Sequence, residues 1–199
     1  MIDYVLFSIT TTASTLVNAR CYLAPVVETL TELKKEINRC HWEILRRTLF
    51  SHIMDVALVK QERGVFDVLL QVYDDGNQWF RIVESTLPFR EEDVALILGL
   101  RCNGDIVSFK HERDQSMFEQ TFLNKMHNRH SDAIKVNLFK LVGSKDDEEE
   151  TFLKLLIVYF MMTIFFPNTS QNAPRFTATH TNDLTSLGRY SWTHAFTCG

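Results

Sequence analysis

The sequence predicts a mainly α-helical protein with a short β-hairpin or strand pair around residues 79–83 and 105–109. Two observations lead to this fold class. Apolar residues recur at steps of three and four through most of the chain, which is the period of an amphipathic helix. Residues 79–83, in contrast, follow a strong turn signal and carry aromatic and β-branched side chains, and residues 105–109 form a second short extended segment.

The composition bounds the domain organisation and the partners. The 199 residues are 45% hydrophobic and 23% charged, as in an ordinary globular domain, and the net charge of −4 provides no global attraction to nucleic acid. Four widely spaced cysteines without a Cys-x-x-Cys pair favour free thiols inside the cell. We expect residues 1–24 to form a poorly defined arm. Residues 25–199 are expected to form one helical domain, truncated where the last predicted helix meets Gly199.

Two apolar segments could be mistaken for export or membrane signals. Residues 4–9 lack the preceding basic residues of a signal peptide. Residues 155–166 are shorter than the roughly 20 apolar residues that a spanning helix needs. We therefore expect a soluble protein without membrane contact, in which residues 155–166 form a buried core helix.

The first third of the chain is predicted to be helical. Pro25 opens an amphipathic helix whose apolar side carries Val26, Leu30, Leu33 and Ile37. A second helix is expected over residues 42–59. A third spans residues 65–73 and ends at the turn signal Asp74-Asp75-Gly76-Asn77.

Residues 90–98 form the helix whose two ends are clearest in the sequence. Glu91, Glu92 and Asp93 complement the helix dipole in the first turn, and Gly99 is placed to end the helix. Further helices are expected over residues 114–126 and 133–142, the latter capped by Ser131-Asp132. A long apolar helix with an acidic first turn ends at Pro167, residues 168–173 are expected to be a loop, and short helices begin near residues 182 and 190.

Three segments together resemble the plant mobile domain, a module of plant transposons and of host proteins derived from them. They are residues 79–82 with 87–100, the apolar helix 152–166, and residues 183–184 with 187–192. The residues that carry the resemblance are Phe80, Leu87, Phe89, Glu92, Asp93, Val94, Leu98, Gly99, Leu100, Asp183, Leu184, Tyr190 and Trp192. Two positions depart from the pattern: Arg90 stands where a capping Thr or Ser is usual, and Thr193 stands where Gly is common.

The resemblance implies a nuclear, non-enzymatic interaction module of transposon origin, acting through protein partners or chromatin in transposon silencing or genome stability. The alternative is an inactive companion domain, or a degenerate remnant, of a transposon-encoded cysteine protease for ubiquitin-like proteins. Gly99-Leu100-Arg101-Cys102 is more similar to that branch. The family is often labelled aminotransferase-like, but no Schiff-base lysine or glycine-rich phosphate cradle marks a cofactor site in this sequence.

The sequence offers one candidate catalytic site and one candidate metal site. His41-Trp42 and Cys198-Gly199 are similar to pairs in cysteine proteases, yet the Gln that precedes the nucleophile in those enzymes is missing. A zinc site would need four ligands, and only His127 and His130 are closely spaced, with Cys102 and His111 as the other candidates. We therefore predict no catalytic, cofactor or metal site.

Two basic clusters could contact nucleic acid. One comprises Arg46 and Arg47 with His52, and the other comprises Lys125, His127, Arg129 and His130. Phosphate binding needs several cations on one face, and the acidic net charge favours solvated helix faces instead. Protein partners are therefore the main expectation, and nucleic acid has weaker support.

Overall fold

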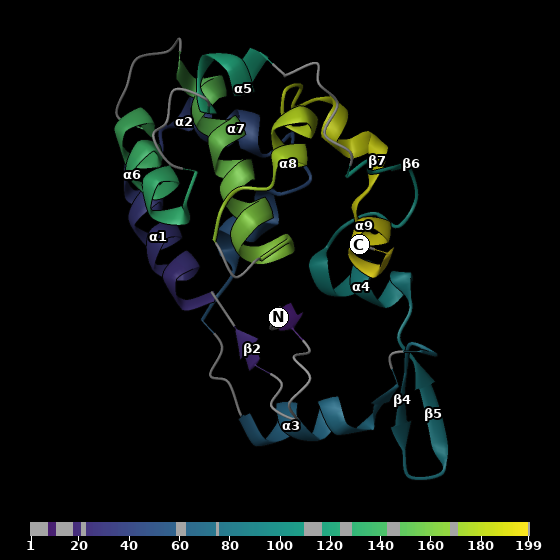
Figure 1. Ribbon diagram of the computed structural model, residues 1–199. Coiled ribbons are helices and arrows are strands. Elements are labelled where there is room, and N and C mark those ends of the chain that lie inside the picture. Colours follow the sequence, from purple (N-terminus) through teal and green to yellow (C-terminus); the bar gives the residue numbers. More distant parts are fainter. Residues whose placement is uncertain are drawn as a thin grey trace.

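The computed structural model describes residues 8–10, 18–20, 23–58, 63–74, 76–109, 117–123, 129–142, 148–167 and 171–198. Within these residues the fold is mainly helical with a small three-stranded antiparallel sheet, which confirms the predicted fold class (Figure 1). The α-helices are α1 (Leu23–Glu36), α2 (Arg39–Leu45), α3 (Arg63–Val72), α4 (Glu91–Leu98), α5 (Met117–Thr121), α6 (Ser131–Val142), α7 (Glu149–Phe160), α8 (Arg175–His180) and α9 (Trp192–Cys198).

Shorter elements complete the chain. The 3-10 helices are η1 (Ser51–Asp55) and η5 (Ser186–Arg189), and η4 (Met161–Phe165) is a π-helical continuation of α7. The strands are β1 (Ser8–Thr10), β2 (Asn18–Arg20), β3 (Tyr73–Asp74), β4 (Trp79–Ile82), β5 (Ser85–Pro88), β6 (Asp105–Ile106) and β7 (Tyr190–Ser191). The N-terminal segment that was predicted to be poorly defined, residues 1–24, lies largely outside the described residues.

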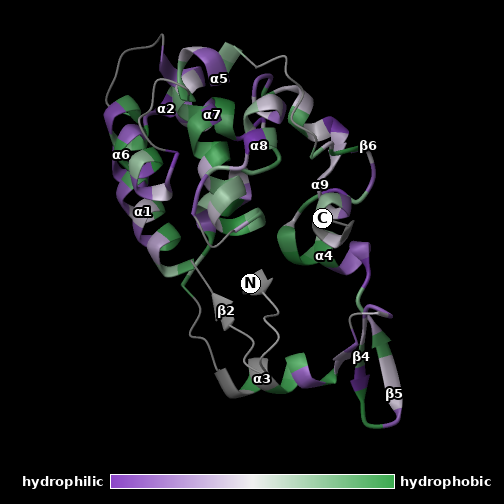
Figure 2. Cartoon of the chain, viewed as in Figure 1, coloured by the Kyte–Doolittle hydropathy of each residue, from purple (hydrophilic) through white to green (hydrophobic). Residues whose placement is uncertain are grey.

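Helix α7 is the centre of the core. Every residue from 155 to 160 is buried, α2 and α6 pack against α7, and α1 packs against α6 and against η4, the continuation of α7. Figure 2 shows α7 mostly in the hydrophobic colour, whereas α1 and α6 alternate between hydrophobic and hydrophilic residues, as expected for helices with one solvated side. The prediction of a buried core helix is therefore confirmed. Among the described residues, no helix is long and apolar enough to cross a membrane.

The predicted continuous helix over residues 42–59 is wrong. Asn38 caps the backbone amide of His41 at 2.9 Å, so α2 begins at Arg39. α2 ends at Leu45, and turns separate it from η1; within them, Thr48 Oγ1 donates to the Leu45 carbonyl at 2.7 Å. The apolar pattern continues across the break, which is why periodicity did not reveal it.

Helix α8 was not predicted. Its sequence, Arg-Phe-Thr-Ala-Thr-His, lacks a clear apolar stripe. The threonines are accommodated because their hydroxyls bond to nearby carbonyls: Thr177 Oγ1 donates to the Pro174 carbonyl at 2.6 Å, and Thr181 Oγ1 donates to that of Thr177 at 2.8 Å. Buried threonines thus occupy positions at which an amphipathic helix usually carries apolar residues.

Other helix boundaries differ from the predictions in smaller ways. Ser131 does not cap α6 from outside but is its first residue, and its hydroxyl donates to Gln171 Oε1 at 3.0 Å. The predicted helix 114–126 is represented by α5 and a following turn, with residues 114–116 and 124–126 outside the described part. Residues 190 and 191 form β7, so the last helix begins at Trp192.

The strands form where extended segments were expected, and the structure assigns their partners. β4 lies between β3 and β5 in an antiparallel sheet, with Phe80 opposite Leu87. β6 pairs in parallel with β7 from the far end of the chain, so that Asp105 lies opposite Tyr190. We call α3 together with β3, β4 and β5 the arm (residues 63–74 and 76–88); Figure 1 shows it below the helical body.

Candidate functional site

Both ends of α4 are stabilised by side chains. Arg90 precedes the helix and cannot accept a hydrogen bond, but its backbone amide donates to Asp93 Oδ2 at 2.8 Å. A full capping box has two reciprocal hydrogen bonds between the residue before the helix and the third helical residue. With Arg in place of Ser or Thr, only the bond accepted by Asp93 forms. At the other end, Gly99 is left-handed with φ +64°, and His52 Nε2 donates to the Leu98 carbonyl at 2.6 Å.

Glu91 joins α4 to α9. Its Oε1 accepts the hydroxyls of Ser191 and Thr193, each at 2.9 Å, and its Oε2 lies 3.4 Å from His194 Nδ1. The same two hydroxyls approach the backbone carbonyls of the loop after α4, at 3.2 Å for Ser191 and 3.1 Å for Thr193. Because both hydroxyls face acceptors, this arrangement clamps two helices together and does not present an activated nucleophile. We call it the α4–α9 junction.

The junction changes the titration of Glu91. Partial burial would raise the pKa of this carboxyl, but hydrogen bonds from Ser191, Thr193 and His194, together with the charge of His194, outweigh burial and lower the pKa. A carboxyl with a lowered folded-state pKa stabilises the protein above its unfolded-state pKa. That contribution disappears as pH falls through the folded-state pKa.

Replacing Glu91 by Gln is therefore expected to destabilise the protein at neutral pH and to matter progressively less in acid. The measurement is the free energy of unfolding in urea between pH 7 and pH 3 for both proteins. Glu92→Gln is the matched control, because Glu92 is exposed on the same helix. A Glu91→Gln deficit that stays constant over this pH range would show that the junction does not depend on the carboxylate charge.

Trp192 is the largest buried side chain at the junction. It is 1% exposed, and its Nε1 donates to the Leu187 carbonyl at 2.9 Å. Its ring meets Phe50 at 6.0 Å and Tyr190 at 5.9 Å between centroids, both edge-on. Trp192 thus connects the end of the chain to the central core.

The structure places the residues of the resemblance in two regions. The α4–α9 junction and the core beside it hold Asp93, Val94, Leu98, Gly99, Leu100, Tyr190 and Trp192. Phe80 and Leu87 lie on the arm, and Phe89 connects the arm to α4 with its ring 5.9 Å from that of Phe80. The remaining residues are Glu92, which is exposed, and Asp183 and Leu184, which form the turn before η5.

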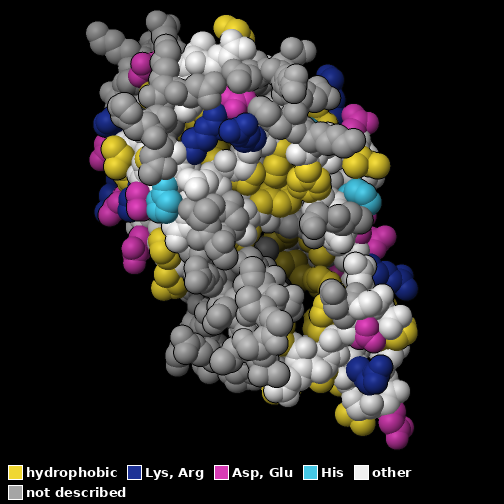
Figure 3. Space-filling view, in the orientation of Figure 1, with side chains coloured by type: hydrophobic (Ala, Val, Ile, Leu, Met, Phe, Trp, Pro, Cys, Tyr) yellow, Lys and Arg dark blue, Asp and Glu magenta, His cyan; other side chains and the backbone are white. Residues whose placement is uncertain are grey.

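The arm exposes large apolar side chains. On α3, Val65, Val68 and Leu69 are 61%, 58% and 42% exposed, and their spacing puts them on one helix face. On the hairpin, Leu87 is 57% exposed and Val83, at the tip, is 92% exposed. Figure 3 shows hydrophobic side chains on the arm and on the face of the body above it. Apolar groups that gather in this way are characteristic of interaction sites.

Of the protease-like pairs, His41 is buried in the described part of the chain. His41 is 1% exposed, its Nδ1 accepts the Asn38 amide at 3.3 Å, and its ring packs 4.7 Å from Phe152. Burial lowers the pKa of His41, although Glu149 acts in the opposite direction. Cys198 lies on α9, which Figure 1 shows at a different place in the molecule from α2.

The metal and nucleic-acid candidates are also spread out. Among the described residues, no group of three or more His, Cys, Asp or Glu side chains is arranged to hold a metal ion; His111 and His127 lie outside them. The first basic cluster is divided, because His52 binds the end of α4 while Arg46 lies over Trp42 at 5.9 Å. In the second cluster, Lys125 lies outside the described residues, and Arg129 pairs with the buried Glu119 at 2.9 Å.

The fold and site define a helical domain with a projecting arm and a clamped carboxyl-terminal helix. The chain matches the family model described as "Domain of unknown function (DUF8566)" over residues 19–197, and it therefore belongs to this family. The comparisons with curated proteins and with solved structures find no match.

Sequence reasoning missed several residues of the junction. Glu91 was interpreted only as a dipole-complementing acid, Thr193 only as a departure from the plant mobile domain pattern, and Ser191 was given no role of its own. The spacing Ser-x-Thr, from Ser191 at the end of β7 to Thr193 in α9, is too common to be a signal, and its partner Glu91 lies about a hundred residues earlier. The nearest available signal for these residues is that hydroxyl side chains flank Trp192, a tryptophan predicted to be buried.

Proposed function

We propose that this protein is a non-enzymatic interaction module and that the arm is the surface that binds a protein partner. The observation that carries the proposal is the exposed apolar stripe Val65, Val68 and Leu69 on α3, on the same arm as the exposed hairpin residues Ile82, Val83 and Leu87. A stable monomer gains nothing by exposing this much apolar surface, whereas a partner that covers it gains hydrophobic free energy.

The tip of the hairpin adds a second argument. Val83 has φ +54°, a left-handed conformation that is strained for a β-branched residue. Asn or Gly would form the same two-residue turn without strain. A strained and 92% exposed Val at the tip is therefore better explained by contact with a partner than by folding.

The nuclear location and the transposon origin in this proposal rest on the resemblance to the plant mobile domain. Its first segment includes Phe80 and Leu87, which face each other across β4 and β5, and it continues through Phe89 into α4. The residues that carry the resemblance thus run from the proposed binding surface to the α4–α9 junction. We infer that such a module acts in transposon silencing or genome stability through the partner that the arm binds.

The experiment compares partner capture by the tagged full chain and two variants in plant cell nuclei. Val68→Glu with Leu87→Glu is expected to reduce the enrichment of captured partners by about tenfold, because two charges would have to be buried in an apolar contact. Val136→Glu is the matched control, since Val136 is 53% exposed on α6, away from the arm. Proximity labelling with quantitative mass spectrometry measures the enrichment.

Two outcomes would contradict parts of the proposal separately. Equal enrichment for the arm variant and the wild type would reject the arm as the binding surface. A tagged chain that is not enriched in nuclei would reject the nuclear assignment, whatever the arm binds.

A further inference from the structure

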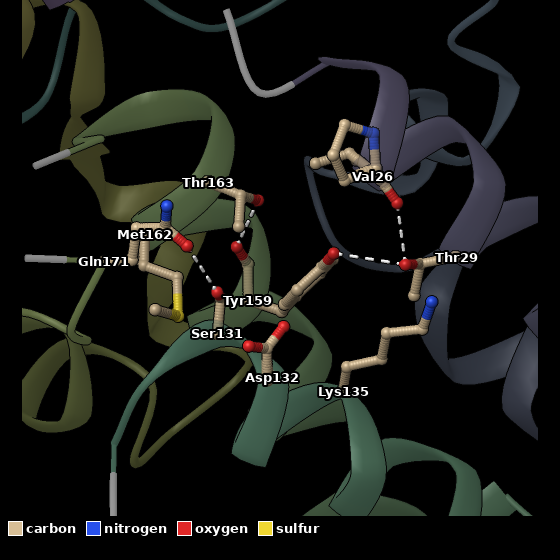
Figure 4. Close-up of a pocket in the computed structure, with 10 residues that line it drawn as sticks. Val26, Thr29, Ser131, Asp132, Lys135, Tyr159, Met162, Thr163 and Gln171 are labelled. Carbon is tan, nitrogen blue, oxygen red and sulfur yellow. Dashed lines mark hydrogen bonds between the residues drawn. The ribbon is translucent and has the colours of Figure 1, made fainter. Parts of the chain in front are cut away.

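A cavity of about 330 Å³ lies between α1, the start of α6 and the end of α7. Figure 4 shows Thr29, Tyr159 and Thr163 around it, with Asp132 and Lys135 on α6. This volume is at the small end of the range for ligand pockets. Much of the wall is apolar and is formed by side chains such as Val26 and Met162.

The hydroxyl groups of the cavity have already donated their hydrogens to the protein. Tyr159 donates to Thr29 Oγ1 at 3.3 Å, and Thr29 donates to a backbone carbonyl of α1 at 2.7 Å. Ser131 donates to Gln171 Oε1 at 3.0 Å, and Thr163 donates to the Tyr159 carbonyl at 2.6 Å. Burial raises the pKa of Tyr159, so its phenol remains a donor to Thr29. What these hydroxyls can still offer a ligand is oxygen lone pairs.

The two charged side chains at the rim of the cavity, Asp132 and Lys135, differ in their ability to bind a ligand. Lys135 Nζ forms an ion pair with Glu32 Oε2 at 3.8 Å and lies 6.0 Å from the ring centroid of Phe139. The Asp132 side chain is 90% exposed, with one oxygen 3.4 Å from His130 Nδ1. Asp132 therefore retains carboxylate lone pairs that can be aimed at a ligand, while Lys135 already has an acidic partner.

The wall also contains an irregular helix segment. α7 continues as the π-helix Met161–Phe165, in which the Phe166 amide donates to the Met161 carbonyl at 2.6 Å. This wider turn carries Met162 and Thr163, both of which line the cavity. Single π-helical turns within α-helices occur frequently at functional sites.

We propose that this cavity binds a primary ammonium ion with a short apolar tail. An ammonium group carries three hydrogen-bond donors and no acceptor, which complements the oxygen lone pairs of the cavity's hydroxyl groups and of the Asp132 carboxylate. The tail would contact Val26 and Met162, and the small volume limits its length. No arm residue lines this cavity, so a result against the proposed function does not contradict this inference, and the reverse also holds.

The first test is a titration of the purified full chain with isoamylammonium, followed by nuclear magnetic resonance. Isoamyl alcohol and isocaproate are the neutral and anionic comparisons with a similar apolar tail. We expect isoamylammonium to bind about tenfold more tightly than either and to shift the signals of Met162 and Tyr159. Tighter binding of isocaproate would overturn the inference, as would no saturable binding of the amine up to its solubility limit.

Two substitutions at the rim provide a test of charge sign. Asp132→Asn is expected to weaken amine binding severalfold, and Lys135→Met is expected to strengthen it by removing a like charge. Glu36→Gln and Lys35→Met are the matched controls, because both residues are exposed on α1 and do not line the cavity. Opposite signs for the two rim variants support the ammonium site, and changes in the same direction would overturn it. All four residues are partly or fully exposed, so folding is retained.

Discussion

Gly104→Ala is expected to lower the free energy of unfolding by about 3 kcal/mol or more, the sum of backbone strain and overpacking. Gly104 has φ +146°, a conformation that side chains rarely adopt. An added Cβ would lie 2.9 Å from the Tyr190 carbonyl carbon and 3.0 Å from the Ser191 nitrogen, and closer still to the Arg189 carbonyl oxygen. These are backbone atoms, so relief requires β7 to move away from β6.

Urea unfolding of the purified chain measures this effect, and the control lies nearby. Gly188→Ala should change the free energy of unfolding by less than about 0.5 kcal/mol, because a Cβ there meets nothing within 4 Å. Similar effects at the two glycines would mean that β6 and β7 are not held as closely as the structure indicates.

Trp192→Ala is expected to lower the free energy of unfolding by about 4 kcal/mol, as is usual for a buried aromatic residue. The substitution removes a ring that is 1% exposed and opens a cavity between α9 and Phe50. It also removes the donor to the Leu187 carbonyl, which would be left buried without its partner. The same urea experiment gives the magnitude, and exposure of the core can be followed by dye binding.

Two further variants separate size from hydrogen bonding. Trp192→Phe retains most of the apolar contact and should cost about half as much as Trp192→Ala, mainly through the lost donor. Trp42→Ala should cost about 1 kcal/mol, because Trp42 is only partly buried on α2. If Trp42→Ala were as destabilising as Trp192→Ala, the deeper burial of Trp192 would not account for its expected effect.

Together these variants test whether the end of the chain is integrated into the core. The β6–β7 pairing and Glu91 connect the β7–α9 segment to residues about 85 to a hundred positions earlier, and Trp192 connects it to Phe50, earlier still in the chain. The arm, by contrast, is supported mainly by Phe89 and the ring contacts around Phe80. Loss of the junction should therefore unfold the body, whereas substitutions on the arm should change binding with little effect on stability.

Local rules predicted several elements from the sequence. The period of Val26, Leu30 and Leu33 predicted α1, and the acidic first turn with Gly99 predicted both ends of α4. Each of these signals acts within one or two helical turns, so the residues that determine the element are neighbours in the sequence. The apolar run that forms α7 was recognised as core for the same reason.

The remaining features depend on residues that are far apart in the chain. The partners of β4 and β6, the polar helix α8, the break at Thr48 and the Glu91 clamp all involve contacts or hydrogen bonds that periodicity does not encode. The cavity is likewise assembled from three segments, with Thr29 and Tyr159 separated by 130 positions. Residue patterns thus established a helical domain, its core helix α7, and the two ends of α4. Packing between distant segments established the junction, the cavity and the exposed arm, because hydrogen-bond partners and burial are properties of the assembled chain.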